Sequence, residues 1–126
     1  MKEYGFSKQE RLCRRDDFQL LVSKGRSFYV YPFRCIYLRK EDAVFSARIA
    51  VSVSKKRFKR ATDRNRIKRL IRESYRLEKQ MLYDSYREKP QNLDMLIIYT
   101  DTKILPFSSF RKSMSKLIIR LIKENG

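Results

Sequence analysis

The chain has 126 residues, with 31 lysines and arginines against 14 acidic residues and a formal net charge of +17. This length predicts one domain spanning residues 1–126, large enough to bury a hydrophobic core. A hydrophobic fraction of 42%, with eight Tyr and eight Phe, argues against a disordered basic tail. So large an excess of cations repels itself unless a polyanion or salt compensates it.

Membrane insertion and export are not indicated. The longest apolar runs, Met95–Tyr99 and Leu117–Ile122, are much shorter than the about 20 residues that span a bilayer. The N-terminus, MKEYGFSKQERL, has no apolar signal core. No segment is basic on one side and broadly apolar on the other, as an interfacial helix would be. We therefore expect a cytoplasmic protein with no membrane partner.

The residue inventory also limits the chemistry. Histidine is absent, which removes the commonest general base and every Ser–His or Cys–His mechanism. The two cysteines, Cys13 and Cys35, lack the spacing and companion ligands of a zinc site. We expect both to be reduced, with Cys35 in the core of a strand.

The chain begins with a polar, basic segment, residues 1–12, which we expect to be irregular. A short helix follows, with Asp16 as the predicted N-cap and Gly25 placed to end it. One side of this helix carries Phe18, Leu21 and Val22.

Two strands come next. Ser27–Lys40 is rich in aromatic and β-branched residues but is interrupted by Pro32, which predicts an edge piece near Phe28–Val30 and a main strand over Phe33–Arg39. Phe45–Ser54 alternates clearly. One face has Ile49, Val51 and Val53, and the other has Arg48, Ala50, Ser52 and Ser54. The small, polar face could line a shallow cleft or let a helix pack closely, and the sequence leaves both open.

The stretch from Lys55 to Arg76 is the most basic in the chain, with only Asp63 and Glu73 as acids. On a helical wheel, Ile67, Leu70, Ile71, Ser74 and Tyr75 share one arc. The neighbouring arc holds Arg64, Asn65, Lys68, Arg69, Arg72 and Arg76. Thr62 or Asp63 is the candidate cap of the regular part, although an earlier start of the helix is left open, and the helix extends to about Lys79 or beyond.

A solvated helix normally gains i,i+4 ion pairs worth about 0.2–0.5 kcal/mol each. Here Arg64, Lys68 and Arg72 place like charges at that spacing. The face is therefore not shaped for the stability of the isolated helix, and arginines in rows suit a backbone of phosphates.

Pro90–Asn92 is predicted to break the chain before Asp94–Tyr99, a nearly continuous apolar run typical of a central strand. The last helix begins at Pro106, with apolar residues at helical spacing. The order α-β-β-β-α-β-α predicts an α/β sandwich.

The basic segment resembles a known family. Val51–Lys56, then Ala61-Thr62, then Arg64–Glu73 (RNRIKRLIRE) closely resemble the signature of the bacterial ribonuclease P protein component. The resemblance covers essentially the whole chain, including the Asp17-Phe18 helix. One departure is the run Arg57–Arg60, where the family often has a small residue or glycine.

The resemblance implies a two-layer α/β (α+β) fold of the ribosomal protein S5 domain 2 type, with a left-handed βαβ crossover around the basic helix. It implies a subunit of a ribonucleoprotein endonuclease that removes the 5′ leader of precursor tRNA. In that enzyme a catalytic RNA supplies the active site and uses magnesium (Mg2+). The partners would be this RNA and precursor tRNA, with no DNA and no membrane.

The resemblance also implies roles for residues. Phosphate and ribose contacts to RNA would come from Lys55, Lys56, Arg57, Arg60, Arg64, Asn65, Arg66, Lys68, Arg69 and Arg72, with Lys59 extending the same patch. A separate cleft between the first helix and the sheet would hold the single-stranded leader, lined by Phe18, Val22, Arg34 and Ile36. Composition alone is equally compatible with Phe18 as an ordinary core residue.

Three other hypotheses share the composition. A general RNA-binding protein of ribosomal or chaperone type would not require the Arg-Asn-Arg spacing. A small metal-dependent nuclease would require carboxylates converging on metals about 4 Å apart, whereas the acids here are scattered, unless the fold gathers them. A helix-turn-helix DNA reader would require a partner helix before the basic one. We expect the isolated protein to have no catalytic residues and to cut nothing.

Overall fold

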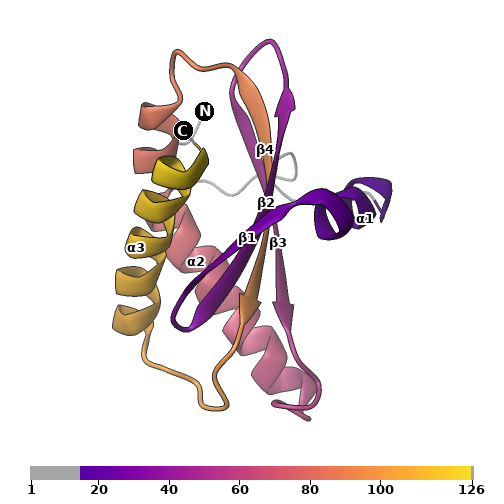
Figure 1. Cartoon of the computed structure of the whole chain (residues 1–126). Helices are drawn as coiled ribbons and strands as arrows, with labels where there is room; N and C mark the ends of the chain where they lie inside the picture. The colour runs from indigo at the N-terminus through magenta and orange to yellow at the C-terminus, as the bar shows by residue number, and fades with distance from the viewer. Residues whose placement is uncertain (1–14, 126) are drawn as a thin grey trace.

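The computed structural model describes residues 15–125, so the predicted irregular segment, residues 1–12, and Cys13 lie outside the described residues. Within them, three helices and a four-stranded sheet follow one another in the predicted order (Figure 1). In residues 15–125 no helix combines the length with the hydropathy that a bilayer-spanning segment requires. The elements are α1 (Arg15–Lys24), β1 (Arg26–Val30), β2 (Phe33–Glu41), β3 (Ser46–Val53), α2 (Ala61–Ser85), β4 (Gln91–Tyr99) and α3 (Phe107–Asn125).

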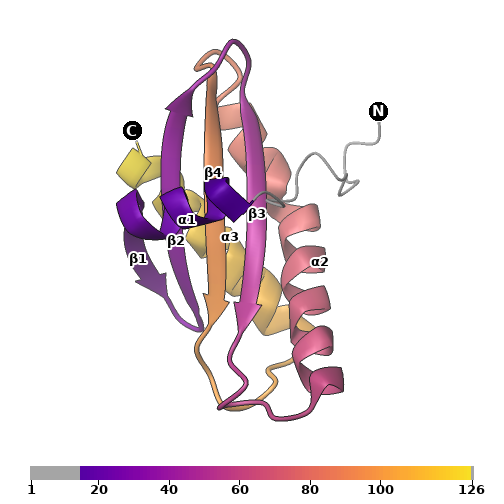
Figure 2. The same ribbon diagram turned by 90° about the vertical axis from the view of Figure 1, so that its right-hand side faces the viewer.

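The sheet has the strand order β1-β2-β4-β3, which places β4 inside the sheet as predicted. β2 pairs antiparallel with β1 and β4, whereas β3 pairs parallel with β4. Parallel neighbours need a crossover, and α2 supplies it (Figure 2). Seen from the α2 side with β3 and β4 pointing up, β4 lies to the left of β3. The crossover is therefore left-handed, against the usual preference, and this expectation is confirmed.

The main hydrophobic core lies between the sheet and the layer formed by α2 and α3 (Figures 1 and 2). Phe110 of α3 packs between Phe33 and Tyr99, with ring centroids 5.8 and 5.4 Å away. Cys35 is a buried free thiol in this core, as predicted, and burial raises its pKa. Of the apolar residues predicted from helical spacing, α3 leaves Phe107 half-buried and buries Phe110, Met114, Leu117, Ile118 and Leu121.

Among the described elements, α1 alone packs on the other face, where it crosses the middle of the sheet (Figure 2). Leu21 of α1 is fully buried against Leu96 of β4, with Ile36 and Ala50 packed beside them. A helix therefore does pack on the small side chains of β3. Ser52, two residues further along the same face, stays only half-buried. The close-packing alternative is therefore confirmed at Ala50.

The predicted N-terminal caps are wrong, whereas Gly25 does follow the last residue of α1, as predicted. α1 already includes the residue before Asp16, so Asp16 lies in the first turn, where its charge suits the helix dipole. α2 begins after Arg60, and no side chain caps it. Thr62 and Asp63 therefore lie inside the helix.

Two further boundaries differ from the prediction. Gln91 and Asn92, expected in a break, belong to β4 because they pair with Glu41 and Lys40 of β2. α2 continues to Ser85, as the open upper bound of the prediction allowed.

Gly25, which follows α1, is required by close packing. A Cβ on Gly25 would lie 2.8 Å from Cγ2 of Ile36 and still nearer to the carbonyl oxygen of Leu21. Because a backbone carbonyl oxygen cannot move aside as a flexible side chain can, we expect Gly25→Ala to lower the free energy of unfolding by about 1–3 kcal/mol. Urea unfolding measures this, with exposed Ser27→Ala as a control that should change stability by less than about 0.5 kcal/mol. Equal stability of the two variants would contradict the packing argument.

Candidate nucleic-acid interface

The loop between β3 and α2 is held by a hydrophobic anchor. Phe58 is only 7% exposed and packs against Tyr99, with ring centroids 6.0 Å apart. Its backbone nitrogen donates to the carbonyl oxygen of Ser54 at 3.0 Å. Because the ring turns inward, its charged neighbours are held outward. The exposed cations of the loop are Lys55, Lys56, Arg57, Lys59 and Arg60.

Arg64 fastens this loop to α2. Its Nη1 donates to the carbonyl oxygens of Phe58 at 2.8 Å and Lys59 at 2.9 Å. The side chain is only half-exposed. Arg64 therefore orders the loop, a role that the wheel did not indicate, in addition to the charge that it contributes.

The apolar and charged arcs of α2 separate as predicted. Ile67, Ile71, Ser74 and Tyr75 are buried. Arg76 departs from the predicted set because it pairs with Glu73 on the same helix. Of the other residues predicted to bind RNA from this helix, Arg64 and Lys68 are half-buried; the exposed ones are Asn65, Arg66, Arg69 and Arg72.

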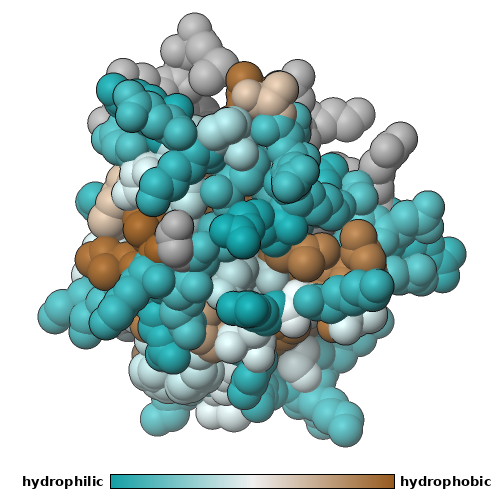
Figure 3. All heavy atoms as spheres, turned by 45° about the horizontal axis from the view of Figure 1, so that its top comes forward, coloured by the Kyte–Doolittle hydropathy of each residue, from teal (hydrophilic) through white to brown (hydrophobic). Residues whose placement is uncertain are grey.

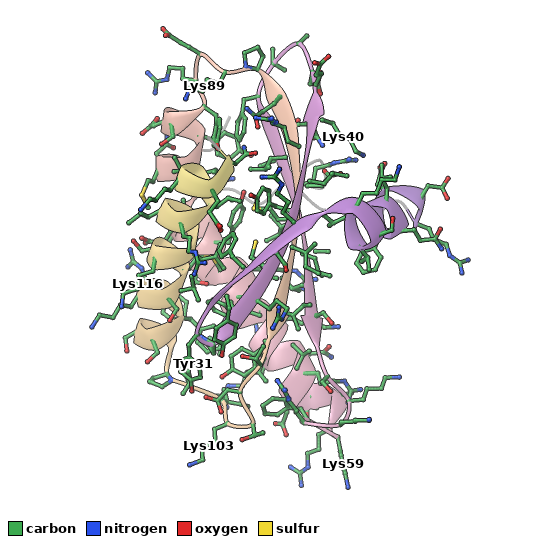
Figure 4. The ribbon with its side chains drawn as sticks, viewed as in Figure 1. Tyr31, Lys40, Lys59, Lys89, Lys103 and Lys116 are labelled. Atoms are coloured by element: carbon green, nitrogen blue, oxygen red, sulfur yellow. The ribbon has the colours of Figure 1, made fainter. Side chains whose placement is uncertain are left out.

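Loop and helix together place these cations at one end of the molecule. The loop leaves β3 at the end where β4 also finishes, and Lys59 marks this end in Figure 4. The N-terminus of α2 adds the positive end of a helix dipole there. Each exposed guanidinium group in this arrangement can bind two phosphate oxygens at once.

The residues predicted for the second cleft lie on α1 and β2. Phe18 is 37% and Val22 51% exposed, so Phe18 is not an ordinary core residue. Arg34 is exposed on β2, and Ile36 packs against the buried Leu21. Half-exposed apolar side chains beside a cation can receive an unpaired base.

An ion-pair network joins α1 to the sheet. Arg48 of β3 donates from Nε and Nη2 to the two carboxylate oxygens of Asp94, both at 2.8 Å, and Asp94 is fully buried. Lys40 Nζ lies 3.3 Å from the same carboxylate. Asp17 of α1 accepts from Lys40 and from Arg48, each at 3.1 Å. Figure 4 shows Lys40 on the α1 side of the sheet.

Sequence reasoning missed this network. The available signal was Arg48 in a strand of small and apolar residues, together with Asp94 at the start of an apolar run, because a charge in such a setting needs a partner. The hydrogen bond from Lys40 and the charge of Arg48 lower the pKa of Asp17 below its ordinary value, against the opposing effect of burial.

Within residues 15–125, no group of three or more His, Cys, Asp or Glu side chains could hold a metal ion. Asp17 and Asp94, which meet through their shared partners, are already neutralised by Lys40 and Arg48. The donor set that the described residues offer therefore does not fit a protein-borne magnesium site.

Hydrophilic residues cover most of the face drawn in Figure 3, and hydrophobic atoms appear on it in separate small patches. Such a surface suits a charged partner better than an apolar interface. The fold and the exposed cations thus define a class, a basic α/β protein built to bind a polyanion.

Comparison with known proteins identifies the family. The family model for Ribonuclease P matches residues 6–122. The ribonuclease P protein component of Porphyromonas gingivalis (strain W83) is 40% identical over 119 residues, covering 94% of this chain and 87% of the relative. The chain therefore belongs to the ribonuclease P protein component family, whose members are subunits of a tRNA-processing ribonuclease. A general RNA-binding protein, the main alternative, is not favoured.

Solved structures agree. The ribonuclease P protein of Thermotoga maritima is 26% identical, with a TM-score of 0.68 and coverage of 88% of this chain and 96% of that one. A mutant of the Staphylococcus aureus ribonuclease P protein, described as having defective mRNA degradation activity, is 25% identical, with a TM-score of 0.64 and coverage of 92% and 90%. The expected fold is thereby supported independently.

We expect Asp17→Asn to destabilise the fold by about 1–3 kcal/mol at neutral pH, because Arg48 and Lys40 each lose a charged partner. A lowered folded pKa gives stability that is present above the unfolded pKa, about 4, and is lost as the pH falls through the folded pKa. The variant should therefore lose less stability than the parent below pH 4. Urea unfolding from pH 3 to pH 7 measures both effects. Asp16→Asn, on the same turn, is the control, and parallel pH curves for Asp17→Asn and the parent would contradict the network's role.

Proposed function

We propose that the whole chain, residues 1–126, works as one domain that binds both the catalytic RNA of ribonuclease P and the 5′ leader of precursor tRNA. The catalytic RNA contacts the exposed cations of the loop and α2. The leader lies in the cleft between α1 and the sheet. The observation that carries the proposal is that the loop and the first turns of α2 concentrate exposed cations beside a half-covered sheet face.

The chemistry of the basic surface supports the first contact. Arg69 and Arg72 extend from the exposed arc of α2, away from buried Ile67 and Ile71, so an RNA can reach them without disturbing the core. Phosphate contacts supply most of the affinity of such surfaces and release counterions. A helix-turn-helix docking is not supported, because α2 follows a strand and packs on the sheet and α3.

The arrangement of the acidic residues supports a division of labour in which the RNA hydrolyses the substrate and the protein binds it. With Asp17 and Asp94 held by cations, the described part of the chain offers no carboxylate cluster for metals. We assign the hydrolysis, and the Mg2+ that it uses, to the RNA of the holoenzyme. The protein contributes binding, positioning and positive potential. We place this activity in the cytoplasm, without DNA or membrane partners.

Reconstitution tests the proposal. Adding the protein to the catalytic RNA should restore leader removal at low Mg2+, because protein cations replace part of the counterion requirement, whereas protein alone should cleave neither precursor tRNA nor mRNA. The assay includes mRNA because one solved structure is of a Staphylococcus aureus ribonuclease P protein mutant described as having defective mRNA degradation activity. Cleavage by the RNA-free protein would overturn the division of labour.

Arg69→Ala tests the basic surface in the same assay. Loss of one phosphate contact should weaken binding to the catalytic RNA and reduce the slope of log K against log salt by about one. Arg87→Ala is the matched control, since it removes the same charge at the far end of α2 from a side chain paired with Asp84. Arg64→Ala should lose more than Arg69→Ala, because it also releases the loop. Equal losses for Arg69→Ala and Arg87→Ala would show a dependence on net charge alone.

Phe18→Ala tests the cleft. A base stacked on an aromatic ring contributes about 1–3 kcal/mol, so the variant should bind leader-bearing precursor roughly 5- to 100-fold more weakly and mature tRNA almost unchanged. Leu20→Ala is the control because Leu20, on the same helix, is equally exposed at 37%. Titration of the reconstituted holoenzyme with both RNAs gives the two affinities. Equal weakening for precursor and mature tRNA would place the leader elsewhere.

A further inference from the structure

A transverse row of side chains crosses the open part of the sheet. Tyr29 of β1 pairs with Arg34 of β2, Arg34 with Ile98 of β4, and Ile98 with Ser52 of β3. The row shares the α1 side of the sheet, since Ile98 packs near Leu21. Ser52 stands just before the basic loop. The row therefore connects the loop to the free edge at β1.

Tyr29 lies flat across this surface. Its hydroxyl is 3.1 Å from Oγ1 of Thr100, which directly follows β4, although the backbone of Tyr29 lies in β1. Because β2 lies between these strands and neighbouring strands are about 4.8 Å apart, the ring must extend over β2. Tyr29 is nevertheless 42% exposed, so a ligand can reach the side chain from solvent.

The ring is held in this position before any ligand binds. Thr100, its hydroxyl partner, is fixed by two hydrogen bonds to the carbonyl oxygen of Pro32, both 2.8 Å long. On the other side, Arg120 of α3 donates to the carbonyl oxygen of Tyr29 at 2.9 Å. A pre-ordered aromatic ring loses little conformational entropy when a ligand stacks on it.

Arg34 supplies a cation beside the ring. Its guanidinium carbon lies 6.0 Å from the ring centroid, at the outer limit of a cation–π contact. At that distance the guanidinium is held only weakly over the ring, so it can turn aside to the adjoining phosphate when a base stacks there. An exposed aromatic ring next to an arginine is the arrangement that binds single-stranded RNA without reading its sequence.

We propose that Tyr29 and Arg34 form a stacking site for one unpaired nucleobase of the leader and its phosphate, at the β1 edge of the sheet. The site takes Arg34 from the predicted cleft set of Phe18, Val22, Arg34 and Ile36, and adds Tyr29, which that set lacks. It supplies an aromatic ring to a cleft in which Val22 and Ile36 are aliphatic. The inference rests on the proposed function, because it assumes that the leader crosses this face.

Abasic scanning of the leader tests the site. Precursor tRNAs that each carry one abasic leader nucleotide are bound to holoenzyme reconstituted with parent protein, Tyr29→Leu or Tyr29→Phe. With the parent, abasic substitution at one leader position should cost on the order of tenfold in affinity. Tyr29→Leu should bind the intact leader on the order of tenfold more weakly and lose sensitivity at that position alone. Tyr29→Phe, which keeps the ring, should retain the sensitivity.

Tyr31→Leu is the matched control. Tyr31 is 55% exposed and its hydroxyl also reaches across to a residue after β4, but that partner is the carboxylate of Asp101, which repels phosphate. Holoenzyme with Tyr31→Leu should bind every leader-bearing precursor with the same affinity as the parent holoenzyme. Thermal unfolding with unchanged midpoints shows that the variants are folded.

The outcomes separate the two hypotheses. If Tyr29→Leu binds all leaders as the parent does while Phe18→Ala loses leader affinity, the stacking site is wrong and the proposed function stands. Equal losses for Tyr29→Leu and Tyr31→Leu also refute the site, because they indicate a general effect of the β1–β2 turn. If the parent holoenzyme does not prefer leader-bearing RNA at all, the proposed function itself fails.

Discussion

Burial of one arc of α2 against the sheet is the constraint on which the remaining structure depends. Ile67, Ile71 and Tyr75 can be buried only if the adjoining arc faces outward, so hydrophobic burial orients the arginines. The parallel pairing of β3 with β4 then requires α2 to start where these strands end. Positive charge therefore gathers at one end of the molecule because of packing, although the cations repel one another.

On the opposite face of the sheet, ion pairs as well as apolar contacts hold α1 in place. Hydrophobic contact between α1 and the sheet is small, with Leu21 and Leu96 as its buried residues. The fully buried Asp94 adds a charged link through Arg48 and Lys40 to Asp17. An ion pair of this kind adds little net stability compared with apolar packing, but removing one partner is costly. The role of these ion pairs here is to fix the position of α1 on the sheet.

The sequence predicted most of the fold because hydrophobic period and element order are local properties. The arcs of α2 and the apolar spacing of α3 could be assigned in this way. The caps could not, since Arg60 precedes α2 without any side-chain signal. The network of Asp17, Arg48 and Asp94 also could not, because its members are 31 to 77 positions apart and only the sheet register brings them together. For the site, the motif indicated which cations matter, but not that Arg64 holds the loop.

The position of α1 therefore determines how much of this sheet face is open to solvent. If α1 moved along the strands toward Ser52 and Ile98, it would bury more apolar surface, at about 25 cal/mol per Å2, and it would cover the row that leads to Tyr29. Asp17 opposes this shift, because moving it away from Arg48 and Lys40 would leave charges unpaired above a buried carboxylate. The network thus keeps half of the face free at the expense of hydrophobic contact. A surface left open in this way is available to a ligand that brings its own stacking partners and negative charge.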